Sequence, residues 1–178
     1  MAAVVEHRRE HRRLRLALDC LVCDVRASDL QLLEWFGTYA HLRRMEEANY
    51  RDVEAGTKLW LVAEVNGFPV RHLKVNLRVV DPSRGNPRGY IFALRVFDPF
   101  QGLGIGTALI EAAEGALRAR GFRYVSIAVG KDNPRARRLY ERLGYAMYRE
   151  EIGRWQYVDP EGRLHRVEEP EYLMDKPL

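Results

Sequence analysis

Hydrophobic and polar positions follow two spacings along this chain, one typical of strands and one typical of helices. Runs rich in β-branched and aromatic residues predict strands at residues 21–26, 58–65, 70–80, 90–96 and 122–129. Apolar residues three or four positions apart predict helices at residues 28–36, 39–49, 105–120 and 134–143. Further strands are predicted from residue 146 to about 151, at 155–158 and at 163–167. Asn66-Gly67 predicts a tight hairpin turn between two of the strands.

This order of elements predicts the fold class. The elements run β-α-α-β-β-β-α-β-α and end in further strands, so we expect a mixed, mostly antiparallel sheet flanked by helices, in the α+β (or α/β) group. The 178 residues are enough for one domain with its own core. We predict a basic N-terminal extension at residues 1–19 and a single domain at residues 20–178.

Composition narrows the class of protein. The apolar fraction of 47% and the charged fraction of 30% are typical of a soluble globular protein. No apolar run approaches the roughly 20 residues that cross a bilayer. The Arg residues near the N terminus precede no apolar segment with a cleavage site, so no secretory signal is indicated. We therefore expect a cytoplasmic protein without a membrane partner.

The positive charge is concentrated at the start of the chain. Five Arg residues and two Glu residues fall within the first fifteen positions, while the rest is nearly balanced and the net charge is +4. An Arg-rich arm of this kind is able to contact nucleic acid or an acidic partner. We favour the simpler interpretation, a solvated arm or surface helix.

Cys20 and Cys23 form a CxxC pattern. A zinc site would need two more ligands, and His7 and His11 are the only nearby candidates. The residues between the cysteines are apolar and lead into a predicted strand. We therefore predict two buried reduced thiols and no metal site.

The stretch from Phe97 to Thr107 connects a predicted strand to a predicted helix through three alternating glycines. Glycines let the backbone approach a ligand closely, and the amides of Gly102 to Thr107 converge at the positive end of a helix, which suits a phosphate group. A P-loop is excluded because no Lys follows Gly106. The dinucleotide fingerprint GxGxxG is also absent, because its third glycine is missing.

A second motif follows the next predicted strand. Asn133-Pro134 supplies an N-cap residue and a proline at the first helical position, and Gly144-Tyr145 closes the helix. With this motif the chain resembles the GCN5-related N-acetyltransferase (GNAT) superfamily. Gln101-x-x-Gly104-x-Gly106 is similar to its acetyl-CoA motif, and Asn133-x-x-Ala136-x-x-Leu139-Tyr140-x-x-x-Gly144-Tyr145 to its second signature.

The resemblance implies a GNAT-like acyl-CoA N-acyltransferase fold and acetyl-CoA as co-substrate. In that family the strand before the glycine turn splays from the next strand, and the pantetheine arm pairs with the freed backbone. The expected acetyl-CoA contacts are Leu94, Val96, Gln101, Gly102, Leu103, Gly104, Ile105, Gly106, Thr107, Asn133 and Tyr140.

The resemblance also implies direct transfer of the acetyl group to a primary amine in a ternary complex, without a metal. Tyr140 lies where the family places a tyrosine near the CoA sulfur, and a phenol with a pKa near 10 suits protonation of a departing thiolate. The general base is not identified by sequence. Asp98, at the end of the strand, and Glu64, on the first strand of the hairpin, are candidates.

Acceptor specificity in the family arises from the first two helices, the hairpin and the C-terminal strands. The acidic residues Glu46, Glu47, Asp52 and Glu54 would favour a cationic small-molecule or peptide amine, although a solvated helix face is the simpler interpretation. Four aromatic residues are candidates for pocket or core: Trp35, Tyr39, Tyr50 and Trp60. The extra C-terminal strands would allow a homodimer. Two other functions stay open: a non-catalytic acyl-CoA-binding module, and a nucleic-acid- or ribosome-associated protein that uses the Arg-rich arm.

Overall fold

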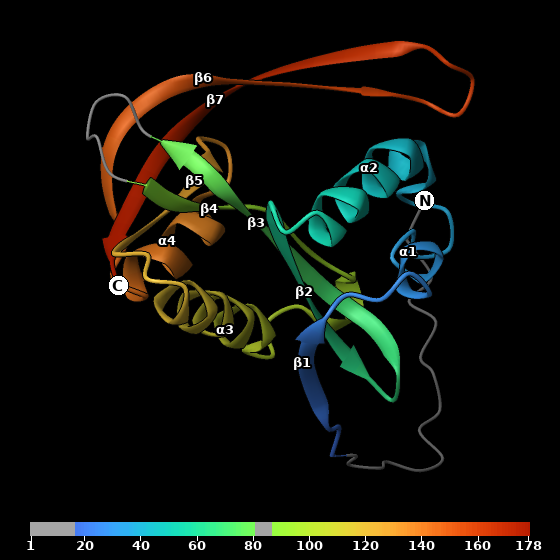
Figure 1. Cartoon of the computed structure of the whole chain (residues 1–178), viewed down its shortest axis with the longest axis horizontal. Helices are drawn as coiled ribbons and strands as arrows, with labels where there is room; N and C mark the ends of the chain where they lie inside the picture. Colours follow the sequence, from blue (N-terminus) through green and yellow to red (C-terminus); the bar gives the residue numbers. More distant parts are fainter. Residues whose placement is uncertain (1–16, 81–86) are drawn as a thin grey trace, which may run out of the picture.

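A computed structural model describes residues 17–80 and 87–178 of the chain. Its centre is a seven-stranded sheet in the order β1-β2-β3-β4-β5-β7-β6, in which β4 and β5 are parallel and all other neighbours are antiparallel (Figure 1). The strands are β1 (Cys20–Asp24), β2 (Lys58–Val65), β3 (Phe68–Val80), β4 (Pro87–Val96), β5 (Tyr124–Gly130), β6 (Ala146–Val158) and β7 (Leu164–Pro177). The predicted fold class is confirmed.

Helices cover both faces of the sheet (Figure 1). One face carries α1 (Asp29–Leu32), the 3-10 helix η1 (Ala40–Leu42) and α2 (Arg43–Glu54), and the other carries α3 (Ile105–Ala119) and α4 (Pro134–Arg142). A second 3-10 helix, η2 (Asp98–Phe100), follows β4.

Strand β2 explains how these layers form. It is apolar at nearly every position, as a strand must be when side chains on both of its faces are buried. Leu59, Leu61 and Ala63 pack with the α3 side of the sheet, whereas Trp60 and Val62 pack in a second cluster with α1 and α2. The hairpin that follows turns at Asn66-Gly67, where φ is +51° and +75°, as the sequence predicts.

The C-terminal strands differ from the prediction. In place of the three short strands predicted at 146–151, 155–158 and 163–167, β6 and β7 form one long hairpin. Their pairing runs from Ala146–Asp175 to Val158–Leu164 with one register shift. Figure 1 shows this hairpin running past the end of the sheet toward α2. The polar and glycine positions that suggested breaks lie on extended backbone, because each strand supplies the other with hydrogen-bond partners.

Strands β4 and β5 pair over a short stretch and then separate. Their register covers only Gly89–Ile91 against Val125–Ile127. Beyond it, β4 contains an irregularity in its pairing with β3, and Ala93 takes a φ of +51°. A β-bulge of this kind bends a strand and turns its backbone away from one partner. The splay expected from the family resemblance is therefore present.

Some predictions about the first part of the chain need correction or lie outside the description. The Arg-rich arm up to residue 16, with His7 and His11, lies outside the described residues, as does the predicted loop at 81–86. Cys20 is exposed and Cys23 half-buried, so the prediction of two buried thiols is wrong for Cys20, which lies on edge strand β1. Within residues 17–80 and 87–178, no helix is long and apolar enough to cross a membrane.

Candidate functional site

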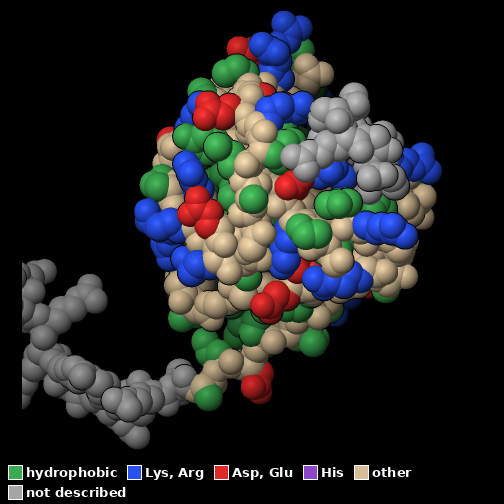
Figure 2. Space-filling model, turned by 90° about the vertical axis from the view of Figure 1, so that its left-hand side faces the viewer, with side chains coloured by type: hydrophobic (Ala, Val, Ile, Leu, Met, Phe, Trp, Pro, Cys, Tyr) green, Lys and Arg blue, Asp and Glu red, His purple; other side chains and the backbone are tan. Residues whose placement is uncertain are grey.

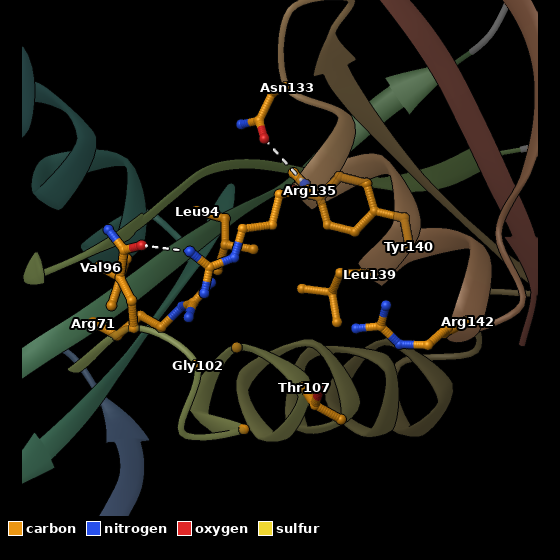
Figure 3. A pocket seen from close by; sticks show the side chains of 14 residues that line it. Arg71, Leu94, Val96, Gly102, Thr107, Asn133, Arg135, Leu139, Tyr140 and Arg142 are labelled. Carbon is orange, nitrogen blue, oxygen red and sulfur yellow. Dashed lines mark hydrogen bonds between the residues drawn. The ribbon is translucent and has the colours of Figure 1, made fainter.

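A cavity of about 400 Å³ lies between the separated end of β4, the glycine turn and α4. Most of the residues that the sequence predicts to bind acetyl-CoA line it: Leu94, Val96, Gln101, Gly102, Gly104, Gly106, Thr107, Asn133 and Tyr140. Ala136 and Leu139, which belong to the second signature, also line it. The sequence did not single out three further lining residues: Arg71, Arg135 and Arg142. Figure 3 shows how these side chains surround the start of α3.

The glycine turn has the backbone that a phosphate site requires. Gly102 and Gly104 lie in the left-handed region, with φ of +79° and +81°, which other residues adopt only with strain. Gly104 is the N-cap of α3, so the first amides of this fifteen-residue helix have no partner within the helix. These amides and the helix dipole make the turn electropositive.

Two predicted contacts have their side chains elsewhere. Leu103 is 61% exposed, and Ile105 is buried in the main core against α3's neighbours. The alternation of glycine and apolar residues in this turn therefore separates two roles. The glycines face the cavity, and the apolar side chains face solvent and core.

Three arginines face the cavity. Arg71 comes from β3, and Arg135 and Arg142 come from the two ends of α4. In Figure 3, Arg71 and Arg135 point toward one another near the glycine turn, and Arg142 approaches from the far end of α4. No carboxylate is among the described residues that line this cavity. Guanidinium groups brought together without a carboxylate favour an anionic ligand.

The surroundings of Arg71 strengthen this conclusion. Burial and the nearby charge of Arg135 lower the pKa of Arg71. Its Nε is buried and has no hydrogen-bond partner among residues 17–80 and 87–178. Arg135 is held from the other side, because it donates to Gln101 Oε1 at 2.9 Å while Gln101 Nε2 donates to Asp98 Oδ1 at 2.8 Å. No sequence pattern singled out Arg71, because the alternation of a strand does not show which neighbouring element a side chain meets.

Charged side chains of both signs cover one end of the molecule. Figure 2 shows the side that lies on the left in Figure 1, where Lys and Arg side chains are spread over the surface with Asp and Glu side chains between them.

Tyr140 lies where the cavity meets the gap between β4 and β5. Its side chain is buried, 5% exposed, and also lines a smaller hollow of about 240 Å³ in that gap. Among the described residues its hydroxyl has no hydrogen-bond partner. Burial raises the pKa of Tyr140 to about 12, against a smaller opposing effect of Arg71. The phenol is therefore protonated at neutral pH and accessible from the cavity.

Asn133 caps α4, as the sequence predicts, and also faces the cavity. Its side chain accepts a hydrogen bond from the amide of Ala136 at 3.0 Å, which caps α4. The same residue lines the cavity.

The two carboxylates predicted as general bases lie outside the cavity. Asp98 is exposed in η2, where it accepts from Gln101. Glu64 lies beside the edge strand β1 and forms an ion pair with Arg26 at 2.5 Å. The pattern of the hairpin indicated that Glu64 sits on a strand, but the pairing of β2 with β1 carries its side chain to another part of the sheet.

The acidic residues of α2 do not form an acceptor site as a group. Glu46 is bound by Lys74 and by Arg95, and Asp52 by Lys58 at 2.9 Å. Glu47 and Glu54 are exposed. Of the four aromatic candidates, Trp35 and Trp60 belong to the second core cluster, and Tyr39 and Tyr50 pack against it. The core interpretation is therefore correct for these aromatics.

A second large cavity lies on the α2 face of the sheet. It has a volume of about 420 Å³ and is enclosed by α2, β4, β5 and the β6–β7 hairpin. Lys74, Arg95, Tyr90, Phe92, Glu169 and Glu171 contribute to its walls. The sequence did not connect the carboxylates of β7 with this site, because their position depends on the register of β7 beside β5.

Comparison with known proteins gives a family match. The model of the acetyltransferase (GNAT) family matches residues 25–145. An uncharacterised N-acetyltransferase from Methanocaldococcus jannaschii is 36% identical over 86 residues, which are 48% of this chain and 38% of that protein. The mycothiol acetyltransferase of Nocardiopsis dassonvillei is 42% identical over 64 residues, 36% of this chain and 19% of that protein. The matches thus span well under two thirds of either relative.

Solved structures share the fold. Arabidopsis thaliana NAA60 in complex with acetyl-CoA superposes with a TM-score of 0.65 at 20% identity, covering 90% of this chain and 99% of that one. At this identity the likeness concerns the arrangement of helices and strands.

Proposed function

Because this chain belongs to the acetyltransferase (GNAT) family, we propose that it is an acetyl-CoA-dependent N-acetyltransferase that transfers the acetyl group directly to a primary amine. The observation that carries the proposal is the cavity beside the glycine turn. It combines a helix N terminus, three arginines and a separated strand, and no described carboxylate lines it.

The residues of this cavity fit acetyl-CoA. The pyrophosphate is a multiply charged anion, and the amides of Gly102 to Thr107 with Arg71 and Arg135 supply donors for it. The buried, unpartnered Nε of Arg71 is a donor that such an anion would satisfy. A Cβ added at Gly102 would lie 3.5 Å from the Arg135 guanidinium, so backbone and cation enclose the same space.

The apolar part of acetyl-CoA fits the separated strand. Beyond Ile91, the backbone of β4 has no pairing with β5. The groups of Leu94 to Val96 are therefore candidates to pair with the amide-containing pantetheine arm. Bound acetyl-CoA would supply the thioester whose acetyl group is transferred, and a β4 amide at this point would polarise its carbonyl.

Tyr140 is the proposed general acid. Its protonated phenol lies at the junction of the cavity and the gap between β4 and β5. A proton donated there reaches the sulfur as the carbon–sulfur bond breaks. A tyrosine that filled only core space would line neither hollow.

One alternative is a domain that binds acyl-CoA without catalysis. The two functions separate by turnover, since an enzyme releases CoA thiol when an amine is present and a binding module does not. The alternative of a nucleic-acid-associated protein requires salt-dependent RNA binding that is lost when residues 1–15 are deleted. We favour the enzyme because the cavity is continued into the sheet by the separation of β4 and β5.

Calorimetric titration with acetyl-CoA, with CoA as reference, tests the proposal. We expect saturable binding of both, followed by release of CoA thiol when a primary amine is added to the acetyl-CoA complex. A Kd of about 1 mM corresponds to a binding free energy of about −4 kcal/mol. Absence of binding at about millimolar acetyl-CoA would overturn both the enzyme and the binding module.

A further inference from the structure

The two large cavities lie on opposite faces of the sheet and meet at the gap between β4 and β5. The smaller hollow of about 240 Å³ shares Leu94, Asn133 and Tyr140 with the glycine-turn cavity. It shares Phe92 and Ala128, among others, with the cavity beneath α2. A group bound beneath α2 therefore has a path to the same point that Tyr140 faces.

Glu171 is the exceptional side chain in the wall of the α2 cavity. It is 9% exposed, and among the described residues no hydrogen bond or ion pair reaches its carboxylate. The positions around it are shaped to accommodate it. In register it lies opposite Gly130 of β5, and a Cβ added at Gly153 of β6 would come within 2.6 Å of its carboxyl carbon.

The other charged groups of this wall are already paired. Lys74 and Arg95 both bind Glu46, Arg154 binds Glu168, and the indole of Trp155 donates to Glu169 at 3.2 Å. Close by on β6, Arg149 binds Glu151 at 2.7 Å. Removing most of the water from a carboxylate without a protein partner is costly, and a cationic ligand in the cavity would offset that cost.

Resting on the proposed function, we propose that the α2 cavity binds the acceptor as a cationic primary amine and that Glu171 is the residue that binds the ammonium and accepts its proton. Burial and the neighbouring charges of Glu151 and Glu169 raise the pKa of Glu171 to about 7. A carboxylate with that pKa takes a proton from an ammonium more readily than an ordinary glutamate does, and releases it again near neutral pH.

The proton balance of the reaction follows. One proton of the ammonium passes to the Glu171 carboxylate and from there to solvent. The freed nitrogen lone pair forms a bond to the thioester carbonyl carbon, and the carbon–sulfur bond breaks with its electron pair on sulfur. The nitrogen loses a second proton, which balances the one that Tyr140 donates to sulfur. The net products are the acetylated amine, CoA thiol and one proton.

The opposite wall restricts the class of amine. Lys74 and Arg95 share a single carboxylate, so this group carries one excess positive charge at the α2 side of the cavity. Between it and Glu171 lie the rings of Tyr90 and Phe92, stacked with centroids 6.1 Å apart. A substrate with one ammonium group on an apolar body fits this arrangement, whereas a second cation that reached the Lys74–Arg95 side would meet like charge.

Glu171→Gln tests the proposal with Glu150→Gln as its matched control. Glu150 precedes Glu151 on β6. Its side chain is 53% exposed and forms an ion pair with Lys131. Both variants and the wild type are assayed for CoA release with n-butylamine, with spermidine and with a peptide bearing a free N terminus. Calorimetry with acetyl-CoA is run on each protein in parallel.

We expect Glu171→Gln to bind acetyl-CoA as the wild type does and to lose about 10²-fold or more in kcat/KM near neutral pH. The deficit should narrow as the pH approaches about 10, where the amine is neutral on arrival. We expect n-butylamine to be a better acceptor than spermidine. A Glu171→Gln rate equal to that of Glu150→Gln would overturn the role of Glu171, and a preference for spermidine would overturn the proposed substrate class.

Two outcomes separate this inference from the proposed function. Failure of the wild type to bind acetyl-CoA would overturn the proposed function, and the inference with it. If the wild type binds acetyl-CoA but acetylates none of the amines, carbon NMR of the glutamate carboxyl groups decides. The carboxyl resonance of Glu171 is identified as the one that is missing from the spectrum of Glu171→Gln. Addition of n-butylammonium must shift this resonance in the wild type. If it does not shift, the inference is overturned and the proposed function is not.

Discussion

The guanidinium of Arg71 lies against Gly106, so closely that a Cβ added to this glycine would be 2.5 Å from Arg71 Cζ. Arg71 is on β3 and Gly106 in the first turn of α3. Gly106, the third glycine of the turn, is therefore needed because any larger residue would collide with a side chain from another element. Gly104, in contrast, is needed for its left-handed backbone. These are two different physical requirements within one short motif.

Gly106→Ala is expected to weaken acetyl-CoA binding about tenfold or more, because the methyl group displaces a guanidinium whose hydrogen bonds to charged groups are each worth about 1.5–3 kcal/mol. Calorimetry measures the change. Gly115→Ala is the matched control, since it lies in the same helix with nothing within 4 Å of an added Cβ. Equal affinity of the two variants would remove Arg71 from the site.

Gly104→Asp is expected to abolish acetyl-CoA binding while the domain stays folded. The substitution places a carboxylate beside the amides proposed to hold the pyrophosphate, at a φ of +81° that disfavours a side chain. Gly162→Asp controls for backbone strain, because Gly162 has a φ of +86° in the β6–β7 turn and open space around it. Circular dichroism should show that both variants are folded. Calorimetry should show that Gly162→Asp binds acetyl-CoA and that Gly104→Asp does not.

Tyr140→Phe is expected to reduce turnover by about 10²-fold and leave acetyl-CoA affinity nearly unchanged, because only the proton donor is lost. With a pKa of about 12, the phenol of the wild type stays protonated through the neutral range. Tyr145→Phe is the control. Tyr145 donates to Glu114 at 3.1 Å, away from the cavity, so its loss should affect stability and not rate. An unchanged rate in Tyr140→Phe would contradict the proposed general acid.

The raised pKa of Glu171 makes stability depend on pH with a definite sign. Between its usual value of 4.5 and about 7, the folded protein holds a proton that the unfolded chain has released, so this group lowers stability as pH rises through that window. The groups that face it are Glu169 on β7, Glu151 with Arg149 on β6, and Tyr90 on β4.

Glu171→Gln removes this dependence. Its melting temperature relative to the wild type should rise from about pH 4.5 to about pH 7 and then level off. Thermal unfolding across this range, with Glu150→Gln as reference, measures it. A constant difference at all pH values would show that Glu171 titrates normally.

Arg88 and Asp175 form a buried ion pair at 2.6 Å that joins β4 to β7 across β5. Arg88→Met is expected to destabilise the fold by about 3–5 kcal/mol, because it removes one partner of a buried ion pair. The double variant with Asp175→Leu should recover much of this loss. Denaturant unfolding measures both, and equal stability of the single variant and the wild type would contradict the importance of the pair.

Features that depend only on residues close together in the chain could be predicted from the sequence. Alternation and helical spacing gave the order of strands and helices, Asn66-Gly67 the hairpin, and Asn133 the cap of α4, because each follows from local backbone conformation and hydrogen bonding. The same holds for Gly102 and Gly104, whose left-handed conformations are a property of glycine.

Contacts between side chains of separate elements could not be predicted in this way, because they depend on how the strands and helices pack. Arg71 reaches the glycine turn because β3 lies beside β4, and Glu171 reaches the α2 cavity because β7 pairs with β5 in one particular register. The pairing of β2 with β1 places Glu64 beside Arg26, outside the cavity. A shift of one residue in any strand would turn its side chains to the other face, and the linear pattern does not specify that register.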